Sequence, residues 1–323
     1  MTAPHAAEAV EPVINTDFEH CESVYWVFTQ RCNDECDHCY NLSGPRGAVI
    51  SLEECLAIVD HLPARCDRII LSGGEPLADR KKLYAILEAL RKRYGQATQV
   101  MLQTNGDLLT PERLDRILEL GVSRIDIASI DRYHKHQGHR RQELEDLFRS
   151  RGMRGDEQDP LIDKDNYLKS EASFGFWGAT EDMWLGGNWA RGRALEKDIW
   201  KRDGGHNFCA ILSGARGFLG GTELPQEISI QLWRINPCCP GTHRPLGDAR
   251  TERVADVLAQ AAASPVWRAL NRGNPYAMGA ALGLDASFGR RRAEALQNVC
   301  LWCDEFFSQH HNDASSVQGP IEV

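Results

Sequence analysis

Three cysteines lie within eight residues of the chain, at Cys32, Cys36 and Cys39. Thiolate sulfur suits zinc and iron–sulfur clusters better than hard cations, so three converging thiols indicate one soft metal centre. A [4Fe–4S] cluster has four iron corners and normally takes four cysteines. Because this segment supplies three, one iron would remain open to another ligand. A zinc knuckle is the alternative, and it would need a fourth ligand close by.

A buried strand is expected at residues 24–28, directly before the cysteines. Further short apolar strands are expected at residues 68–72, 100–104 and 124–129, and amphipathic helices separate them. Strands that alternate with helices predict parallel βα units and an α/β fold. A parallel barrel places its active site at the carboxyl ends of its strands, which is where the three cysteines would lie.

The strand expected at residues 68–72 is followed directly by Gly-Gly-Glu-Pro at residues 73–76. Paired glycines allow the main chain to approach a ligand closely. This motif and the Cys-x3-Cys-x2-Cys segment together resemble the signature of the radical S-adenosylmethionine (radical SAM) superfamily. The resemblance implies a partial (β/α)6 TIM-type barrel and a [4Fe–4S] cluster on Cys32, Cys36 and Cys39, with SAM chelating the open iron.

The resemblance also implies the chemistry of the site. In the family, the reduced cluster cleaves SAM to a 5′-deoxyadenosyl radical, and a flavodoxin- or ferredoxin-type protein would donate the electron. His38 stands at a position that is usually aromatic in the family and lies near the adenine. The residues expected to contact SAM are His38, Gly73, Gly74, Glu75, Pro76, Thr104, Asn105, Ser129, Asp131 and Arg193, with Arg191 as an alternative to Arg193. Strand-ending and capping roles remain open for those between residues 104 and 131.

A second set of cysteines is spread over the last third of the chain. An alternating segment at residues 228–233 is expected to be an antiparallel strand leading to a Pro-Cys-Cys-Pro run. Four thiolates drawn from one small domain could complete a fully ligated [4Fe–4S] cluster. The expected ligands are Cys209, Cys238, Cys300 and Cys303, with Cys239 as an alternative to Cys238. The order of motifs resembles the SPASM and twitch extensions of radical SAM enzymes, and one auxiliary cluster fits the number of cysteines. A structural zinc site remains the alternative.

The expected domain organisation follows from these two groups. A charged excursion is expected at residues 151–170, and the fifth and sixth barrel strands are expected at residues 174–177 and around residues 183–185. The expected divisions are a flexible arm (1–20), a radical SAM partial barrel (21–203), a small α+β auxiliary-cluster domain (204–308) and a flexible tail (309–323). Cys21, Cys55 and Cys66 are expected to be structural thiols in the core.

Composition narrows the class of protein. The 323 residues carry a net charge of −9, which argues against a protein that coats nucleic acid. No stretch approaches the roughly 20 apolar residues of a membrane helix, and the first residues lack the features of a signal peptide. Eleven cysteines without an export signal indicate metal binding in a reducing cytoplasm rather than disulfides.

The hypothesis favoured by these patterns is a radical SAM oxidoreductase of the dehydrogenase type. A neighbouring cluster would favour a two-electron oxidation of a sugar, an aminocyclitol or a nucleoside in natural-product biosynthesis. The barrel begins about twenty residues into the chain, which leaves no room for a leader-peptide domain and disfavours a ribosomal peptide substrate. A peptide maturase, a redox-neutral epimerase or decarboxylase, and a non-catalytic metal-stabilised binding protein remain alternatives.

The residue that would remove the substrate proton is the least determined part of this hypothesis. Its candidates are His134, His136 and Glu35. Two of them lie in a basic loop at residues 133–141, which is either solvated or grips an anionic group of the substrate.

Overall fold

The computed structural model describes residues 14–136, 138–155, 172–178, 189–211, 215–222 and 225–311. Most of the expected N-terminal arm and C-terminal tail, most of the excursion at 151–170 and the strand expected around residues 183–185 lie outside these ranges. None of the described helices is long and apolar enough to span a membrane.

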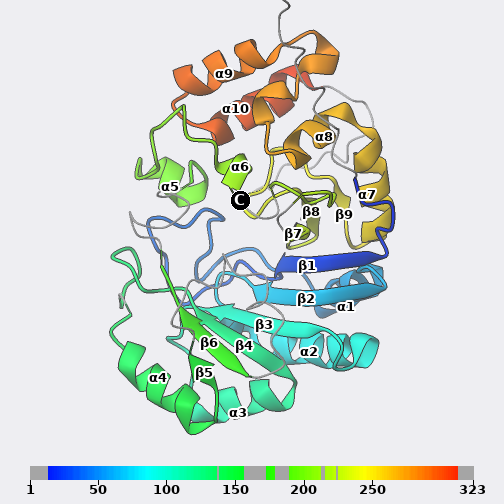
Figure 1. The fold of residues 1–323 in the computed structure, drawn as a ribbon. Helices are drawn as coiled ribbons and strands as arrows, with labels where there is room; N and C mark the ends of the chain where they lie inside the picture. Colours follow the sequence, from blue (N-terminus) through cyan, green and yellow to red (C-terminus); the bar gives the residue numbers. More distant parts are fainter. Residues whose placement is uncertain are drawn as a thin grey trace, which may run out of the picture.

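The described residues form an α/β fold around one open, nine-stranded sheet with the order β5-β6-β4-β3-β2-β1-β7-β8-β9 (Figure 1). The strands from β5 to β7 in this order pair in parallel, whereas β8 and β9 are antiparallel additions at one edge. Their bounds are β1 (His20–Val27), β2 (Arg65–Ser72), β3 (Gln99–Thr104), β4 (Val122–Ile127), β5 (Arg154–Gly155), β6 (Ser173–Phe176), β7 (Glu227–Gln231), β8 (Arg234–Asn236) and β9 (Gly247–Asp248). The sheet is therefore the unclosed, parallel-rich wall of a partial barrel.

Helices connect the parallel strands in sequence, and four more helices gather beyond the β7–β9 edge of the sheet (Figure 1). The helices are α1 (Leu52–His61), α2 (Arg80–Tyr94), α3 (Pro111–Glu119), α4 (Arg141–Ser150), α5 (Gly192–Glu196), α6 (Phe208–Ile211), α7 (Val254–Ala263), α8 (Pro265–Asn271), α9 (Ala286–Ala295) and α10 (Val299–Glu305). Short turns of helix lie at Pro76–Asp79, Pro275–Ala277, Ala280–Leu282 and Phe306–His310. A capping box between Ser51 and Glu54 fixes the start of α1, and Thr110 caps α3 before Pro111.

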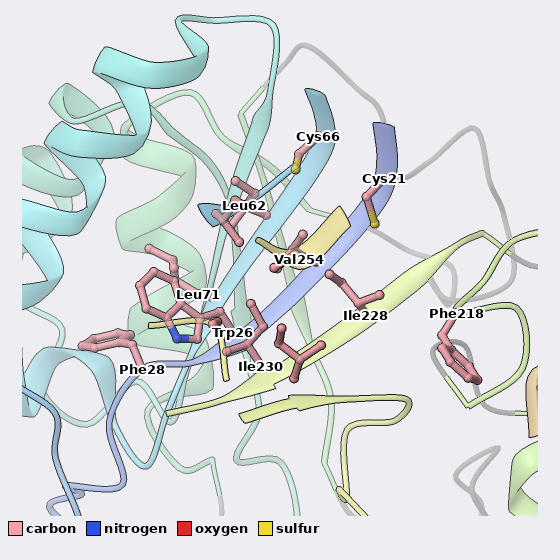
Figure 2. Close-up of a cluster of buried hydrophobic side chains, with 14 of the residues drawn as sticks. Cys21, Trp26, Phe28, Leu62, Cys66, Leu71, Phe218, Ile228, Ile230 and Val254 are labelled. Atoms are coloured by element: carbon pink, nitrogen blue, oxygen red, sulfur yellow. The ribbon is translucent and has the colours of Figure 1, made fainter. Parts of the chain in front are cut away.

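The hydrophobic core lies between the sheet and its helices. Alternate residues of β1, β2 and β7 contribute to it, and Figure 2 shows Trp26, Leu71, Ile228 and Ile230 gathered on these neighbouring strands. The thiols of Cys21, Cys55 and Cys66 are buried in the same core. Because a strand turns successive side chains to opposite faces, the residues between these core positions face the other side of the sheet.

The expected direction of the strand at residues 228–233 was wrong on one side. That strand, β7, pairs antiparallel with β8 as a hairpin, but it pairs in parallel with β1 along its other edge. Alternation of apolar residues reports one buried face and carries no information on the direction of the neighbouring strands. The consequence is that one sheet joins the N-terminal and C-terminal cysteine-bearing segments. The domain boundary at residue 204 remains a prediction.

Candidate functional site

The cysteine loop, residues 29–44, follows β1 directly. Cys32 is buried, and Cys36 and Cys39 are half-buried. Burial, and secondarily the charges of neighbouring carboxylates and thiols, raises the pKa of Cys32 to about 12 and that of Cys36 well above its ordinary value. Without metal the Cys32 and Cys36 thiols are neutral at pH 7, so metal binding has to release their protons.

A compact group of possible metal ligands lies in and beside the cysteine loop. The ligand atoms of Cys36, His38 and His134 all lie within 4.8 Å of one another. A structural zinc ion takes four ligands, and this group offers three, of which one is a thiol. A cluster in which Cys32, Cys36 and Cys39 each bind one iron would instead use all three thiols of the loop.

The Gly-Gly-Glu-Pro motif is hydrogen-bonded to the main chain at the start of the cysteine loop. Gly74 N donates to Thr29 O at 2.7 Å, and Glu75 N donates to Arg31 O at 2.9 Å. A Cβ atom at Gly74 would lie 2.6 Å from Arg31 O, closer than real Cβ contacts. The glycine therefore lets two main-chain segments meet, one of which carries Cys32. Contact of this motif with SAM remains a prediction.

Glu75 is the polar centre beneath the loop. Its carboxylate is fully buried and accepts hydrogen bonds from Thr104 Oγ1 and Asn105 N at 2.8 Å and from Leu77 N at 2.9 Å. Burial raises the pKa of Glu75 to about 7, although these donors oppose that shift. Three residues expected to contact SAM, Glu75, Thr104 and Asn105, thus meet at the carboxyl ends of β2 and β3.

The raised pKa of Glu75 predicts a pH dependence of stability. The folded chain holds this proton up to about pH 7, whereas the unfolded carboxyl loses it near 4.5. Between these values the folded state binds more protons, so the free energy of unfolding falls as pH rises, by about 3 kcal/mol from this group. Thermal unfolding of metal-free protein from pH 5 to 8 would measure the fall, and Glu75→Gln is expected to flatten it. An equal slope in both proteins would contradict the assignment.

Ser129 and Asp131 have partners within the chain. Ser129 Oγ donates to Asn105 O at 2.9 Å, which ties the end of β4 to the end of β3. Asp131 accepts from Tyr133 N and from the ring Nδ1 of His134, each at 2.9 Å. These are the strand-ending and capping roles that the sequence left open, and a contact with SAM remains a prediction for both residues.

His38 is an uncharged ring packed among other rings. It stacks on Tyr133 with a centroid separation of 5.0 Å and meets His134 edge-on at 4.8 Å. Burial lowers the pKa of His38 to about 4, so the imidazole is neutral at pH 7. Its Nδ1 atom is buried without a hydrogen-bond partner. A neutral ring with a free polar atom fits the expected neighbour of a cofactor.

Gly192 and Arg193, at the start of α5, contact the main chain of the cysteine loop. Arg193 donates from its backbone N to Cys39 O at 2.9 Å, from Nε to Cys36 O at 3.0 Å, and from its guanidinium to Ser43 O. Gly192 has φ of +51°, and a Cβ atom there would lie 2.6 Å or less from the carbonyl oxygens of Cys39 and Tyr40. The described donors of Arg193 therefore fix the loop, and its contact with SAM remains a prediction.

Gly192→Ala is expected to disturb the cysteine loop. Left-handed backbone costs an alanine roughly 1–2 kcal/mol, and the clash with two carbonyls adds to this. Gly283→Ala is the matched control, because Gly283 has φ of +77° and nothing within 4 Å of a Cβ. Urea unfolding and iron content after reconstitution would be compared. If both variants lose the same stability and bind the same iron, the contact of Gly192 with the cysteine loop is unimportant.

The structure brings together the four expected ligands of the second site. The C-terminal cysteine group consists of Cys209 in α6, Cys238 after β8, and Cys300 and Cys303 in α10. Burial is the main reason that their pKa values are raised, and for Cys209, Cys238 and Cys303 repulsion from thiolates of other elements adds to it. Cys300 and Cys303 share one helix face because they are three residues apart. Asn298 caps α10 by accepting from Cys300 N at 2.8 Å.

The adjacent thiol, Cys239, has different neighbours. Its sulfur lies 3.2 Å from Oη of Tyr40, the residue that follows Cys39 in the cysteine loop. Burial raises the pKa of Cys239 to about 12, and hydrogen bonds to Tyr40 and Tyr25 oppose that shift. Of the two adjacent cysteines, Cys238 is therefore the one near Cys209, Cys300 and Cys303.

Arg191, the alternative to Arg193 as a contact for SAM, lies beside the C-terminal cysteine group. Its charge acts there on the Cys238, Cys300 and Cys303 thiols, and its contact with SAM remains a prediction. Its guanidinium pairs with Asp304 at 2.8 Å and donates to Cys300 O at 3.2 Å. The spacing of residues gave no signal for this position, since Arg193, two residues later, points at the other centre.

The candidate proton acceptors differ in how firmly they are held. The His134 side chain is largely buried and paired with Asp131, whereas His136 is more exposed and lies 3.6 Å from Asp107. Glu35 is exposed. In the basic loop, the Arg140 guanidinium is already bound within the chain. It donates to Gly106 O and Asp107 O at 3.0 Å and pairs with Glu143.

Known proteins resemble parts of this chain. Residues 26–149 match the family described as the radical SAM superfamily. The pre-heme d1 synthase of Dinoroseobacter shibae is 37% identical over 109 residues, which are 32% of this chain and 26% of that protein. The AdoMet-dependent heme synthase of Methanosarcina barkeri is 37% identical over 111 residues, which are 32% of this chain and 30% of that protein.

These curated relatives are matched over less than a third of their own length. The solved structure of BtrN in complex with AdoMet and 2-DOIA is 16% identical to this chain, with a TM-score of 0.47. The alignment covers 78% of this chain and 88% of BtrN.

Proposed function

We propose that this chain, whose residues 26–149 match the radical SAM superfamily, oxidises a small molecule by two electrons, starting with removal of a hydrogen atom from a C–H bond. When bound, SAM and a reduced [4Fe–4S] cluster supply the radical that takes the hydrogen atom, and a second cluster supplies an acceptor for the remaining electron. A flavodoxin- or ferredoxin-type donor would provide the initial electron.

The proposal assigns the cysteine loop to the SAM-binding centre. Cys32, Cys36 and Cys39 would hold three irons, and the residues around Glu75 would lie nearest to the open one. The three thiols of one loop and the neutral His38 ring among them support this assignment.

The observation that carries the oxidative half of the proposal is the second site. Four thiols from α6, α10 and the segment after β8, two of them buried and two half-buried, lie together beside a sheet that continues into that region. Four thiolates saturate a [4Fe–4S] cluster, and a saturated cluster has no open iron for substrate. Its use would then be electron transfer or structure, and a zinc ion would serve only the second.

His134 is the favoured proton acceptor. A histidine with one ring nitrogen hydrogen-bonded to a carboxylate is held in one orientation, and its other nitrogen can accept a proton in general-base catalysis. Asp131 provides that carboxylate at 2.9 Å. His136 and Glu35 have greater exposure and are the weaker candidates.

Polar, uncharged groups on the non-core face of the sheet support a hydroxylated substrate of the sugar, aminocyclitol or nucleoside type. Tyr25 Oη donates to Gln103 Oε1 at 2.7 Å and lies 2.9 Å from Ser72 Oγ. Three neighbouring strands thus carry hydroxyl and amide groups on this face, hydrogen-bonded to one another. Such groups match hydroxyl-bearing ligands because each can donate or accept.

The proposal is tested with anaerobically reconstituted protein, SAM and dithionite. Formation of 5′-deoxyadenosine is expected, with about eight irons per chain for two clusters. A panel of sugars, aminocyclitols and nucleosides is then searched for a product lighter by two hydrogens. Absence of 5′-deoxyadenosine under every reducing condition would defeat the enzyme assignment. A product of unchanged mass would defeat the oxidation, and turnover of peptides alone would defeat the small-molecule class.

A tetrapyrrole is the second candidate substrate, and the 37% identity to two heme-related synthases favours it. Each of those matches covers only about a third of this chain. A match of that length cannot include both the C-terminal cysteine group and the strands that form the non-core face of the sheet. An iron-porphyrin arm in the same panel distinguishes the two candidates.

A further inference from the structure

The segment from Trp189 to Arg193 touches both cysteine-bearing centres. Arg193 binds the carbonyls of the cysteine loop, and Arg191 lies beside the C-terminal cysteine group. Trp189 packs edge-on against Tyr40 at 5.0 Å, and Tyr40 meets Cys239, the neighbour of Cys238. The proposed function uses the Arg193 end of this segment, but it assigns no role to Arg191.

Arg191 is a fixed charge rather than a mobile surface cation. Its side chain is 13% exposed, and its guanidinium contacts Ala190 O at 3.0 Å, Cys300 O at 3.2 Å and Asp304 at 2.8 Å. Because little water surrounds it, its field on nearby groups is weakly screened. The main-chain oxygens of Ala190 and Cys300 accept from its guanidinium and so fix its orientation.

The positive charge of Arg191 would affect the reduction of a cluster bound by the four neighbouring thiolates. Four thiolates contribute four negative charges, so a cluster held by them is an anion that becomes more negative on reduction. A nearby positive charge favours the more negative state, and hydrogen bonds and charges around a cluster are known to set its potential. Asp304 acts in the opposite direction and partly offsets Arg191, and His243 also faces Asp304.

We propose that Arg191 is a positioning residue that raises the reduction potential of the group held by the C-terminal cysteine group. This inference rests on the proposed function, since it requires a redox-active group at that site. It gives a role to an arginine whose side chain is held at Cys300 O and Asp304 beside the four thiols. It also makes the site a better electron acceptor, which an oxidation needs and a purely structural site does not.

The test is a redox titration of the reconstituted holoenzyme, followed by electron paramagnetic resonance with and without SAM. The signal that does not respond to SAM reports the C-terminal site, and the SAM-responsive signal is an internal control. Arg191→Gln is expected to shift the one-electron reduction equilibrium of the C-terminal site at least tenfold toward the oxidised form, which is 59 mV. Arg191→Lys is expected to keep most of the wild-type potential, and Asp304→Asn is expected to shift it the opposite way.

The outcomes separate this inference from the proposed function. About eight irons per chain with an unshifted potential in Arg191→Gln would overturn the inference alone. Equal shifts in the Gln and Lys variants would also overturn it, because a merely structural role would be lost in both. About four irons, or zinc at the C-terminal site, would overturn the auxiliary cluster and the inference with it. If Arg191→Gln binds no second cluster, the sign of the shift in Asp304→Asn decides.

Discussion

Replacement of Cys32, Cys36 or Cys39 by alanine is expected to reduce 5′-deoxyadenosine formation by more than about 100-fold and to remove about four irons per chain. Each thiol would hold a different iron, so the loss of one leaves a cluster with two protein ligands. The raised pKa values of Cys32 and Cys36 add to the effect, because metal binding already has to displace protons from buried thiols. The measurement is iron and sulfide content together with chromatographic detection of 5′-deoxyadenosine.

Cys55→Ala is the control for that result. Cys55 lies within α1, and its side chain is fully buried in the hydrophobic core. Its removal is expected to cost about 1 kcal/mol or slightly more of stability through a small cavity and to leave iron and product unchanged. Retention of full iron and product in Cys36→Ala would contradict the cluster assignment. Zinc bound by Cys36, His38 and His134 would contradict it too.

The parts of the site that could be predicted from sequence are those encoded by neighbours along the chain. Cys32, Cys36 and Cys39 are separated by two or three residues, and the glycines of residues 73–76 follow a strand directly. Such spacings fix which atoms can converge before any long-range packing is known. The parallel order of β1 to β4 could be predicted for the same reason, because each strand is joined to the next by one helix.

The parts that could not be predicted depend on contacts between distant segments. The parallel pairing of β7 with β1 joins residues about 200 positions apart, and the pattern of either strand alone is compatible with both directions. Arg191 and Arg193 stand two residues apart but serve different centres, because Arg191 precedes α5 in extended backbone and Arg193 lies within it. His134 reaches Cys36 and His38 only because two separate loops fold over each other.

The choice between Cys238 and Cys239 as a metal ligand also depends on contacts with distant segments, although the two residues are adjacent. In the sequence both follow a strand and a proline, so each had a claim to be the ligand. The fold separates them, since the Cys238 thiol interacts with Cys300 and Arg191, while the Cys239 thiol contacts Tyr40 at 3.2 Å. Successive side chains point in different directions, and a turn decides which of them faces a given partner.

This separation gives the sharpest paired prediction for the second site. Cys238→Ala is expected to lower the iron content from about eight to about four per chain, because a cluster with three ligands in a closed site has lost its saturating thiolate. Cys239→Ala is expected to keep about eight irons, since it removes only the sulfur that faces Tyr40. Both variants remove the same atoms from buried positions in one turn, so general damage to the fold would affect them alike.

The measurement is iron and sulfide content after anaerobic reconstitution, with 5′-deoxyadenosine as the second readout. Cys238→Ala is expected to retain formation of 5′-deoxyadenosine from SAM and dithionite, because the cysteine loop is intact, but to lose most substrate oxidation. The reverse pattern, with iron lost in Cys239→Ala and kept in Cys238→Ala, would move the ligand to the neighbouring thiol. Full iron in both variants would mean that neither residue binds iron, and the C-terminal cysteine group would then lack one of its four ligands.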